Sequence, residues 1–236
     1  MGSSPARARS LGPQWPCRRP AADAGSVNVT SMLNIDALAA TPLTTDPYEY
    51  VHVPGFVRAA ALASVVNDFP EITTPGSHPL ESLAYGKRFG DLIGELDGPE
   101  FEGAVARKFG VELEGRPKIF TVRGMCRPSD GKIHTDTASK IVTVLLYLND
   151  GWDEAGGRLR ILRSATDVDD YAEEIPPTGG LLLVFRRSER SFHGHRPFEG
   201  RRRAIQMNWV TDPGSALLHA LRHRVSSLAK RRIGAR

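Results

Sequence analysis

From position 118 to position 211 the sequence is a succession of short apolar or alternating segments, each bounded by residues that favour turns. Gly, Pro, Asn and Asp dominate the bounding stretches, as at 128–131, 149–151 and 176–180. This pattern predicts many short antiparallel strands. The predicted strands are 119–123, 133–136, 141–148, 158–162, 180–185 and 203–211. We therefore expect a mainly β fold with supporting helices (α+β), in the form of a double-stranded β-helix, or jelly roll.

Helical patterns precede the predicted strands. Residues 48–54 alternate as a strand does, and residues 57–69 then place apolar side chains at helical spacing. A second helix is predicted over 99–109, ended by Gly110, with a shorter one around 89–96. These helices are expected to cover the outside of the larger sheet.

One domain accounts for most of the chain. With 236 residues and 40% hydrophobic content, the chain is large enough to bury one ample core. We predict a single domain over 32–212, with helical support at 55–110 and the jelly-roll core at 116–211. The loop-rich stretch 70–98 is expected to connect the helices and to approach the mouth of the site.

The two ends of the chain differ from this domain in composition. Residues 1–31 are rich in Pro, Ala, Arg, Gly and Ser without periodicity, which indicates a disordered arm or a mis-assigned start. Residues 213–236 carry six basic and no acidic residues and are predicted to form a basic C-terminal helix. The positive charge of the chain belongs to these ends, and a solvated helix is favoured over a nucleic-acid contact.

Cysteine content and hydropathy bound the cellular context. The two cysteines, Cys17 and Cys126, lie far apart and indicate neither a disulfide framework nor a zinc site. No apolar run reaches the roughly 18 residues expected of a membrane span, and no hydrophobic segment follows the basic residues at the start. We expect a cytoplasmic protein without membrane contact.

Three residues predict a metal site. His134 and Asp136 are two apart, so on an extended chain their side chains point to the same face. His193, at the end of the apolar run 180–185, is the candidate for a third ligand, and its neighbour His195 is the less favoured alternative. Two imidazoles and one carboxylate fill one face of an octahedron and leave the other open, which suits Fe(II) and oxygen chemistry.

An ordered series of motifs resembles the Fe(II)- and 2-oxoglutarate-dependent dioxygenases, in particular their prolyl-hydroxylase-like branch. The resemblance covers roughly 116–211. The motifs are His134-x-Asp136, the strand 143–149, Trp152 with 156–161, His193 with Pro197, and 200–205. The resemblance implies an oxidoreductase, most simply a hydroxylase, that uses iron, 2-oxoglutarate and O₂, with ascorbate as an accessory reductant, and releases succinate and CO₂.

The resemblance also implies a cationic clamp for the distal carboxylate of 2-oxoglutarate, and Arg202 stands at its position, nine residues after His193. Arginine suits this task because its planar guanidinium pairs bidentately with a carboxylate. Strand alternation favours Arg202 over Arg201 and Arg203 and places Gln206 on the same face. On the earlier strand, alternation groups the residues that we predict to complete the co-substrate pocket. They are Thr143, Leu145 and Tyr147.

Several other polar or aromatic residues could in principle belong to the site. We interpret His52 and the pair His219 and His223 as structural rather than metal-binding, and Trp152 and Trp209 as packing residues. The basic hairpin with Arg186, Arg187 and Arg190 is most simply a solvated turn. Alternation alone does not place Arg123 or Arg160 relative to the pocket.

Two rival functions and the kind of substrate stay open at this point. One rival is a jelly-roll binding or regulatory module without turnover, and the other is a cupin-type metal-dependent hydrolase or isomerase. The intact set of metal ligands opposes the first rival, and the Arg202 clamp, which water activation does not need, opposes the second. The substrate is either a small molecule or a protein.

Overall fold

The computed structural model describes residues 31–212 and residue 214. The predicted arm therefore lies outside the described residues except for Ser31, and so does the predicted C-terminal helix beyond residue 214, with His219 and His223. The helices are α1 (Ile35–Ala40), α2 (Ala59–Asn67), α3 (Lys87–Asp97) and α4 (Pro99–Phe109), with a 3-10 turn η1 at Leu80–Ser82. The strands are β1 (Tyr50–Val53), β2 (His78–Pro79), β3 (Lys118–Cys126), β4 (Lys140–Tyr147), β5 (Leu159–Leu162), β6 (Tyr171–Ile175), β7 (Leu182–Arg186), β8 (His193–Gly194) and β9 (Gly200–Val210).

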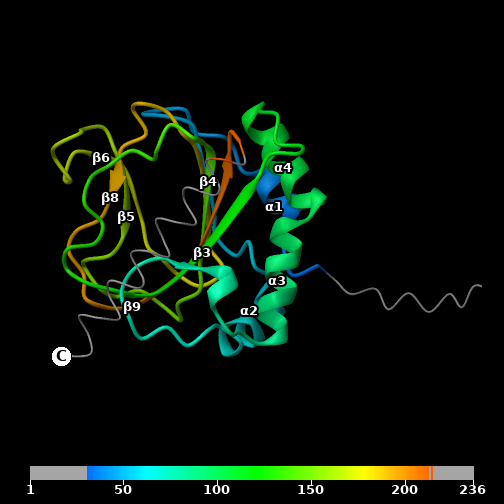
Figure 1. The fold of residues 1–236 in the computed structure, drawn as a ribbon. Helices are drawn as coiled ribbons and strands as arrows, with labels where there is room; N and C mark the ends of the chain where they lie inside the picture. The colour runs from blue at the N-terminus through cyan, green and yellow to red at the C-terminus, as the bar shows by residue number, and fades with distance from the viewer. Residues whose placement is uncertain (1–30, 213, 215–236) are drawn as a thin grey trace, which may run out of the picture. The chain divides into compact units, whose positions relative to one another are not determined.

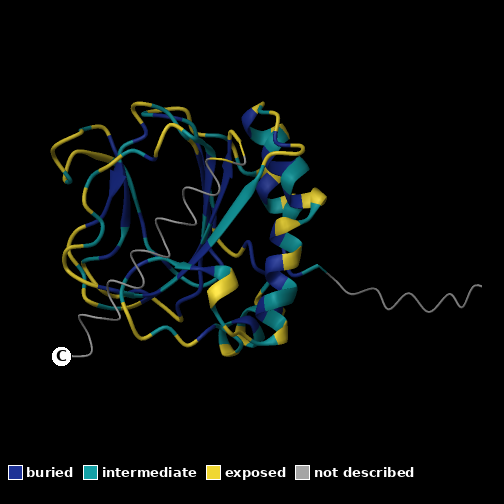
Figure 2. Ribbon diagram, viewed as in Figure 1, coloured by how far each residue is buried: buried dark blue, intermediate teal, exposed yellow. Residues whose placement is uncertain are grey.

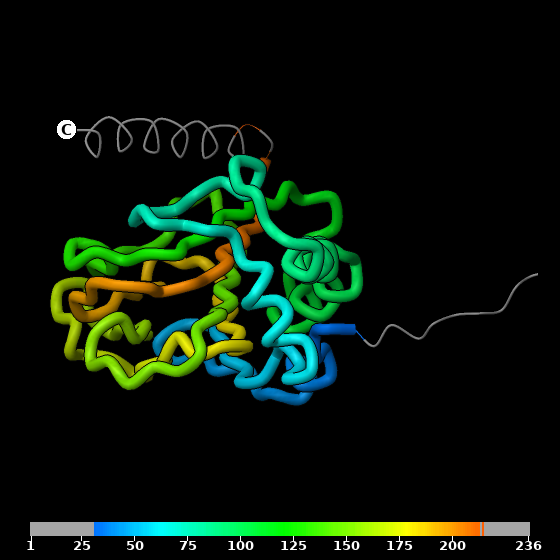
Figure 3. Tube along the Cα trace, turned by 90° about the horizontal axis from the view of Figure 1, so that it is seen from below, coloured from blue at the N-terminus to red at the C-terminus, as the bar shows by residue number. Residues whose placement is uncertain are grey.

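The strands form two antiparallel sheets. The larger one has the order β1-β7-β4-β9-β3-β2, and the smaller one has the order β6-β5-β8. Helices α1, α3 and α4 lie on one side of the larger sheet and the smaller sheet lies on the other (Figure 1). Figure 3 shows the same separation from below, with the green helices far from the yellow segments of the smaller sheet. This arrangement confirms the predicted jelly roll.

Two apolar clusters hold these layers together. The first packs α3 and α4 against the larger sheet through fully buried side chains such as Leu96, Phe101 and Trp209. The second lies between the sheets and joins Tyr147 and Phe185 of the larger sheet to Ile161 of the smaller one. Figure 2 shows dark, buried stretches in both sheets, whereas β3 is mostly of intermediate burial. A rigid scaffold therefore surrounds the space between the sheets.

The two ends of helix α4 are determined by its local sequence. Pro99 occupies the first turn, where its missing N–H costs nothing, and Glu100 and Glu102 complement the positive end of the helix dipole. Gly110 ends the helix in the left-handed conformation, with φ 61°. The predicted helix over 99–109 is confirmed.

Other elements differ from the sequence-based expectation. The predicted strand over 133–136 was wrong as an extended element, because only His134 makes a ladder-type bridge there, with His193. Strand β6 was missed because it is a largely polar, solvent-facing strand that lacks an apolar pattern. Helix α1 was missed because it has only six residues; Asn34 caps it by accepting the Ala37 N–H at 3.2 Å.

None of the helices in the described residues has the length and apolar character that crossing a membrane requires.

Glu95 on α3 anchors the first described residues, and its removal should destabilise the fold. Its carboxylate accepts the backbone N–H groups of Met32 (3.1 Å) and Leu33 (3.2 Å) and the Ser31 hydroxyl (2.7 Å). Glu95→Ala leaves these donors without their acceptor, so we expect a loss of about 1–3 kcal/mol in the free energy of unfolding. The melting temperature should fall by about 2–12 °C.

A matched control is Glu114→Ala, because Glu114 is exposed and makes no hydrogen bond or ion pair within the described residues. This change should stay within about 0.5 kcal/mol of the wild type. Equal melting temperatures for the two variants would show that the Glu95 contacts do not anchor this segment.

Candidate metal centre

Three potential metal ligands meet between the sheets. His134, Asp136 and His193 each offer a donor atom, and these atoms lie within 4.8 Å of one another. His193 belongs to β8, whereas the other two follow β3 in the loop before β4. Two backbone hydrogen bonds hold the loop to β8: His134 N–H donates to the His193 carbonyl at 3.1 Å, and His193 N–H donates to the His134 carbonyl at 3.0 Å. This short bridge brings residues 59 positions apart in the sequence together.

The two imidazoles are oriented by backbone carbonyls. His134 Nδ1 lies 2.8 Å from the Lys132 carbonyl, and His193 Nδ1 lies 3.0 Å from the Ser191 carbonyl. A carbonyl only accepts hydrogen bonds, so each Nδ1 carries the proton and each Nε2 keeps a free lone pair. Such a contact fixes the tautomer of metal-binding histidines. Burial, the main cause, lowers the pKa of His193 to about 4, which keeps its ring neutral at neutral pH.

The carboxylate of Asp136 is held in its charged form. Lys140 Nζ lies 2.5 Å from Oδ1, and the Thr143 hydroxyl donates to Oδ2 at 2.5 Å. Asn208 Nδ2 in turn donates to the Thr143 oxygen at 2.8 Å. Burial acts to raise the pKa of Asp136, but the charges of Lys140 and His193 and the two side-chain hydrogen bonds outweigh it and lower the pKa to about 2. The site therefore offers an ionised oxygen ligand.

These donors open onto a cavity of about 240 Å³. Strands β3, β4 and β9 contribute alternate residues to its wall, as their register requires: Thr143 pairs with Asn208, and Leu145 pairs with Gln206. The lining of the cavity comprises Ser77, Ile119, Thr121, Arg123, Gly131, His134, Asp136, Thr137, Lys140, Thr143, Leu145, Leu159, His193, Gly194, His195, Arg202, Ala204, Gln206 and Asn208. The cavity thus joins the three donors to Arg202.

Arg202 faces this cavity, whereas Arg201 and Arg203 do not line it. The Arg202 side chain is fixed by its Nε, which donates to the Gly157 carbonyl at 2.7 Å. Its Nη2 lies 3.4 Å from the Tyr147 hydroxyl, a long contact, and its guanidinium lies over the Tyr147 ring at 5.2 Å from the centroid. Both side chains are buried. Arg203 instead lies over the ring of Phe69, away from the cavity.

His195 lines the cavity but is not part of the three-residue cluster. Its Nδ1 lies 2.8 Å from the Arg196 carbonyl, and its ring packs directly against Gly131, where an added Cβ would come within 2.2 Å of Nε2. Burial first, and then the charge of Arg202, lowers the pKa of His195 to about 4. The ring is therefore neutral at neutral pH.

The remaining polar candidates have structural partners. His52 contacts Glu173 at 3.1 Å, and Trp152 packs on Phe198. Arg187 Nε donates to the Asp136 carbonyl at 3.1 Å, so part of the basic hairpin supports a metal-ligand residue rather than facing solvent. In the described chain Arg186 pairs with Glu49.

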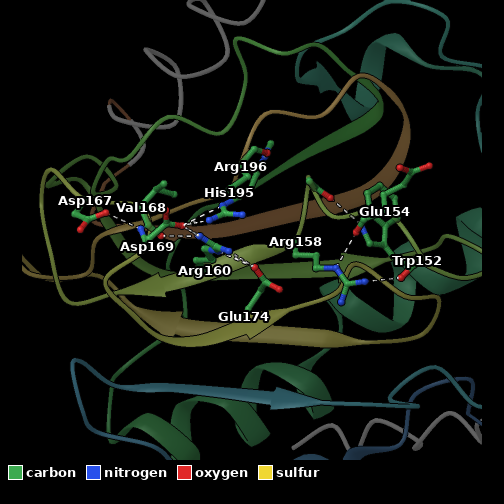
Figure 4. Close-up of polar contacts among 11 residues, drawn as sticks. Trp152, Glu154, Arg158, Arg160, Asp167, Val168, Asp169, Glu174, His195 and Arg196 are labelled. Atoms are coloured by element: carbon green, nitrogen blue, oxygen red, sulfur yellow. Dashed lines mark hydrogen bonds and ion pairs between the residues drawn. The ribbon is translucent and has the colours of Figure 1, made fainter.

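Arg160 belongs to an ion-pair network outside the cavity (Figure 4). It contacts Glu174 at 2.7 Å and also pairs with Asp169, which in turn contacts Arg196 at 2.7 Å. The network ties the β5–β6 connection to the segment after β8, at Arg196, the residue that follows His195.

Sequence reasoning missed two residues around Asp136 and left a third unplaced. Asn208 could have been found by continuing the alternation from Arg202 through Gln206. Lys140 gave no signal in the sequence, because its role depends on the turn between Asp136 and β4. Arg123 faces the cavity together with Ile119 and Thr121, but alternation alone does not say which face of β3 points inward.

The donor set fits Fe(II). Two imidazoles and one carboxylate, with open space beside them, form the facial arrangement typical of non-heme iron. Loss of a residue that only hydrogen-bonds to a metal ligand lowers metal affinity by roughly 10- to 100-fold. His134→Ala and Asp136→Ala should each lower the affinity for Fe(II) by more than that, because no nearby group can replace the missing ligand. Anaerobic competition with a chromophoric chelator measures this.

His195→Ala is the matched control, since it removes a buried cavity histidine that is not in the cluster. Its Fe(II) affinity should stay close to that of the wild type. Normal binding by His193→Ala together with lost binding by His195→Ala would show that the third ligand is His195.

Comparisons with known proteins agree with this geometry. Residues 124–211 match the model of the 2OG-Fe(II) oxygenase superfamily, a stretch that contains all three metal-ligand candidates and Arg202. A search of curated proteins found no match.

Solved structures share the fold at low sequence identity. A prolyl-4-hydroxylase from Pseudomonas putida is 18% identical with a TM-score of 0.51, covering 75% of this chain and 97% of that one. A 2OG-Fe(II) oxygenase family protein from Burkholderia pseudomallei is 13% identical with a TM-score of 0.50, covering 75% and 91%. A prolyl 4-hydroxylase from Phytophthora capsici is 16% identical with a TM-score of 0.52, covering 79% and 68%. The family match over residues 124–211, the jelly roll and the His134, Asp136 and His193 cluster agree with one another, and this part of the chain is similar to the 2OG-Fe(II) oxygenase superfamily.

Proposed function

We propose that this oxygenase is a hydroxylase in which His134, Asp136 and His193 hold the iron and Arg202 holds the distal carboxylate of 2-oxoglutarate. The observation that supports this assignment is the shared cavity, which has the three donors at one end and a buried, oriented guanidinium at the other. A co-substrate with a metal-chelating 2-oxo acid and a second carboxylate needs both ends at once.

The other predicted site residues have separate tasks in this proposal; Thr143, Leu145 and Gln206 line the cavity, and Tyr147 does not line it but contacts Arg202. Leu145 lines the wall along which the co-substrate lies. The Tyr147 hydroxyl helps Arg202 hold the distal carboxylate. Thr143 faces the cavity, but its hydroxyl is bonded to Asp136, so its task is to orient the metal ligand rather than to bind the co-substrate directly. Gln206 forms part of the same wall as Leu145, its partner across the strands.

Iron, when bound, supplies the activation of O₂ that oxidises 2-oxoglutarate to succinate and CO₂ and inserts oxygen into a substrate C–H bond. The protein holds the ligand atoms in position and in the right protonation state. Carbonyl contacts keep the Nε2 atoms of His134 and His193 free, and Lys140 and Thr143 keep Asp136 ionised and fixed.

The site argues against both rival functions. A binding module without turnover has no need of three oriented donors, and a hydrolase or isomerase of cupin type has no need of a buried arginine facing the metal. We further propose a cytoplasmic location, where reducing conditions suit Fe(II) and the free, buried thiol of Cys126. The substrate is a small molecule or a protein side chain that reaches the metal from the open side.

The clamp is testable by binding alone. Arg202→Ala removes one side of a buried charge pair, which costs about 3–5 kcal/mol. The apparent affinity for 2-oxoglutarate should therefore fall by a factor of about 10² to 10³ or more, while Fe(II) affinity stays unchanged. Tyr147→Phe should cost less, about 1–3 kcal/mol. The measurement is a 2-oxoglutarate titration of the Fe(II) protein under nitrogen, followed by charge-transfer absorption.

Arg202→Lys is the conservative control and should recover only part of the affinity, since one ammonium cannot reproduce the two-pronged contact. A wild-type titration curve for Arg202→Ala would remove Arg202 from the co-substrate site. A wild-type protein that binds Fe(II) yet shows no charge-transfer band with 2-oxoglutarate would contradict the proposed function.

A further inference from the structure

A second arginine faces the same cavity. Arg123 on β3 is part of the cavity lining, together with Thr121 two residues before it on the same face. Within the described residues its side chain donates to no carboxylate and makes no ion pair. Arg123 is half-buried, and a cation that is partly shielded from water is more stable when an anion lies beside it. The cavity therefore contains a cation that lacks its counter-charge.

Strand register places Arg123 at the end of the cavity that holds Arg202. Across the larger sheet, Tyr147 of β4, Ala204 of β9 and Arg123 of β3 lie in one row. The row at the metal end consists of Thr143, Asn208 and Ile119. Thr143 contacts the metal ligand Asp136, so Arg123 lies four residues along the strands from the metal end.

Ala204, which has a small side chain, lies between Tyr147 and Arg123 in this row. Arg202 stands two residues from Ala204 on the same face of β9, which makes Arg123 and Arg202 diagonal neighbours. Diagonal pairs on adjacent strands come within reach of each other when their side chains are long. The two guanidinium groups can therefore approach one anion from two strands.

Electrostatics support this shared position. Burial first, and then the charge of Arg202, lowers the pKa of Arg123. Burial raises the pKa of Tyr147, and both arginines oppose that rise, Arg202 more than Arg123. The charge of Asp130 raises the pKa of Arg123 and so offsets part of this lowering. The Asp130 carboxylate is itself paired with Arg127 Nε at 3.1 Å. Two like charges in one pocket are most stable with an anion between them.

We infer that Arg123 is a second cationic partner of the distal carboxylate of 2-oxoglutarate, so that this co-substrate is held by two arginines from adjacent strands. The inference rests on the proposed function, because it assumes 2-oxoglutarate in this cavity. It assigns Arg123 to the co-substrate rather than to the substrate, whose reacting bond must lie beside the metal at the other end.

The test pairs a protein change with a ligand change. Arg123→Gln and the wild type, both loaded with Fe(II) under nitrogen, are titrated with 2-oxoglutarate and with 2-oxopentanoate, which has the same 2-oxo acid but no distal carboxylate. Arg123→Gln should weaken 2-oxoglutarate by about 10- to 100-fold, as for loss of a hydrogen bond to a charged group. Binding of 2-oxopentanoate should stay within about twofold.

Stability and additivity separate binding from a structural role. Without ligand, Arg123→Gln should melt no lower than the wild type, because removing one of two like charges relieves repulsion. The losses in Arg123→Gln and Arg202→Gln should not add in the double variant, since both arginines contact one carboxylate. Lys118→Gln, which removes a charge on the other face of β3, is the matched control and should titrate like the wild type.

Three results would overturn the inference. They are unchanged 2-oxoglutarate affinity in Arg123→Gln, equal weakening of both ligands, and a lowered melting temperature that accounts for the loss. If the wild type itself does not bind 2-oxoglutarate, the proposed function is contradicted. If the wild type binds it and Arg123→Gln binds it equally well, only the inference about Arg123 is contradicted.

Discussion

The pair of backbone hydrogen bonds between His134 and His193 is the contact on which the rest of the site depends. It fastens the loop after β3 to β8, and so to the smaller sheet, at the point where both histidines must reach one metal ion. Without it, His134 would have no backbone hydrogen bond to β8. The larger sheet supplies the complementary contact, since Thr143 of β4 holds the Asp136 carboxylate from the other side. The metal site is thus built across the two sheets.

Charge is distributed along the cavity in a consistent order. At one end, Lys140 keeps Asp136 ionised, and burial keeps His193 neutral, so the donors are in the protonation states that a metal requires. At the other end, Arg202 is buried and Arg123 is half-buried, and neither has a carboxylate partner in the described chain. This polarity matches a ligand that chelates a metal at one end and carries an anion at the other.

The sequence allowed much of this arrangement to be predicted, where local rules operate. Capping signals placed α4. The alternation of β4 and β9 grouped Thr143, Leu145 and Tyr147 with Arg202; Thr143 and Leu145 line the cavity with Arg202, whereas Tyr147 only contacts Arg202. The features that could not be predicted from the sequence depend on tertiary contacts. The partners of Asp136 include Lys140 across a turn, and the face of β3 that lines the cavity is set by the pairing of β3 with β9. The exposed strand β6 carries too few apolar residues to be recognised.

The central claim is that the three donors and the cavity beside them support oxidation of 2-oxoglutarate. Succinate release tests it most directly, because uncoupled turnover requires no knowledge of the substrate. With Fe(II), 2-oxoglutarate and O₂, the wild-type protein should form succinate in amounts that depend on all three, and Asp136→Ala should form none above the iron-only background. Equal succinate from the two proteins, or none from an iron-loaded wild type that binds 2-oxoglutarate, would contradict the account.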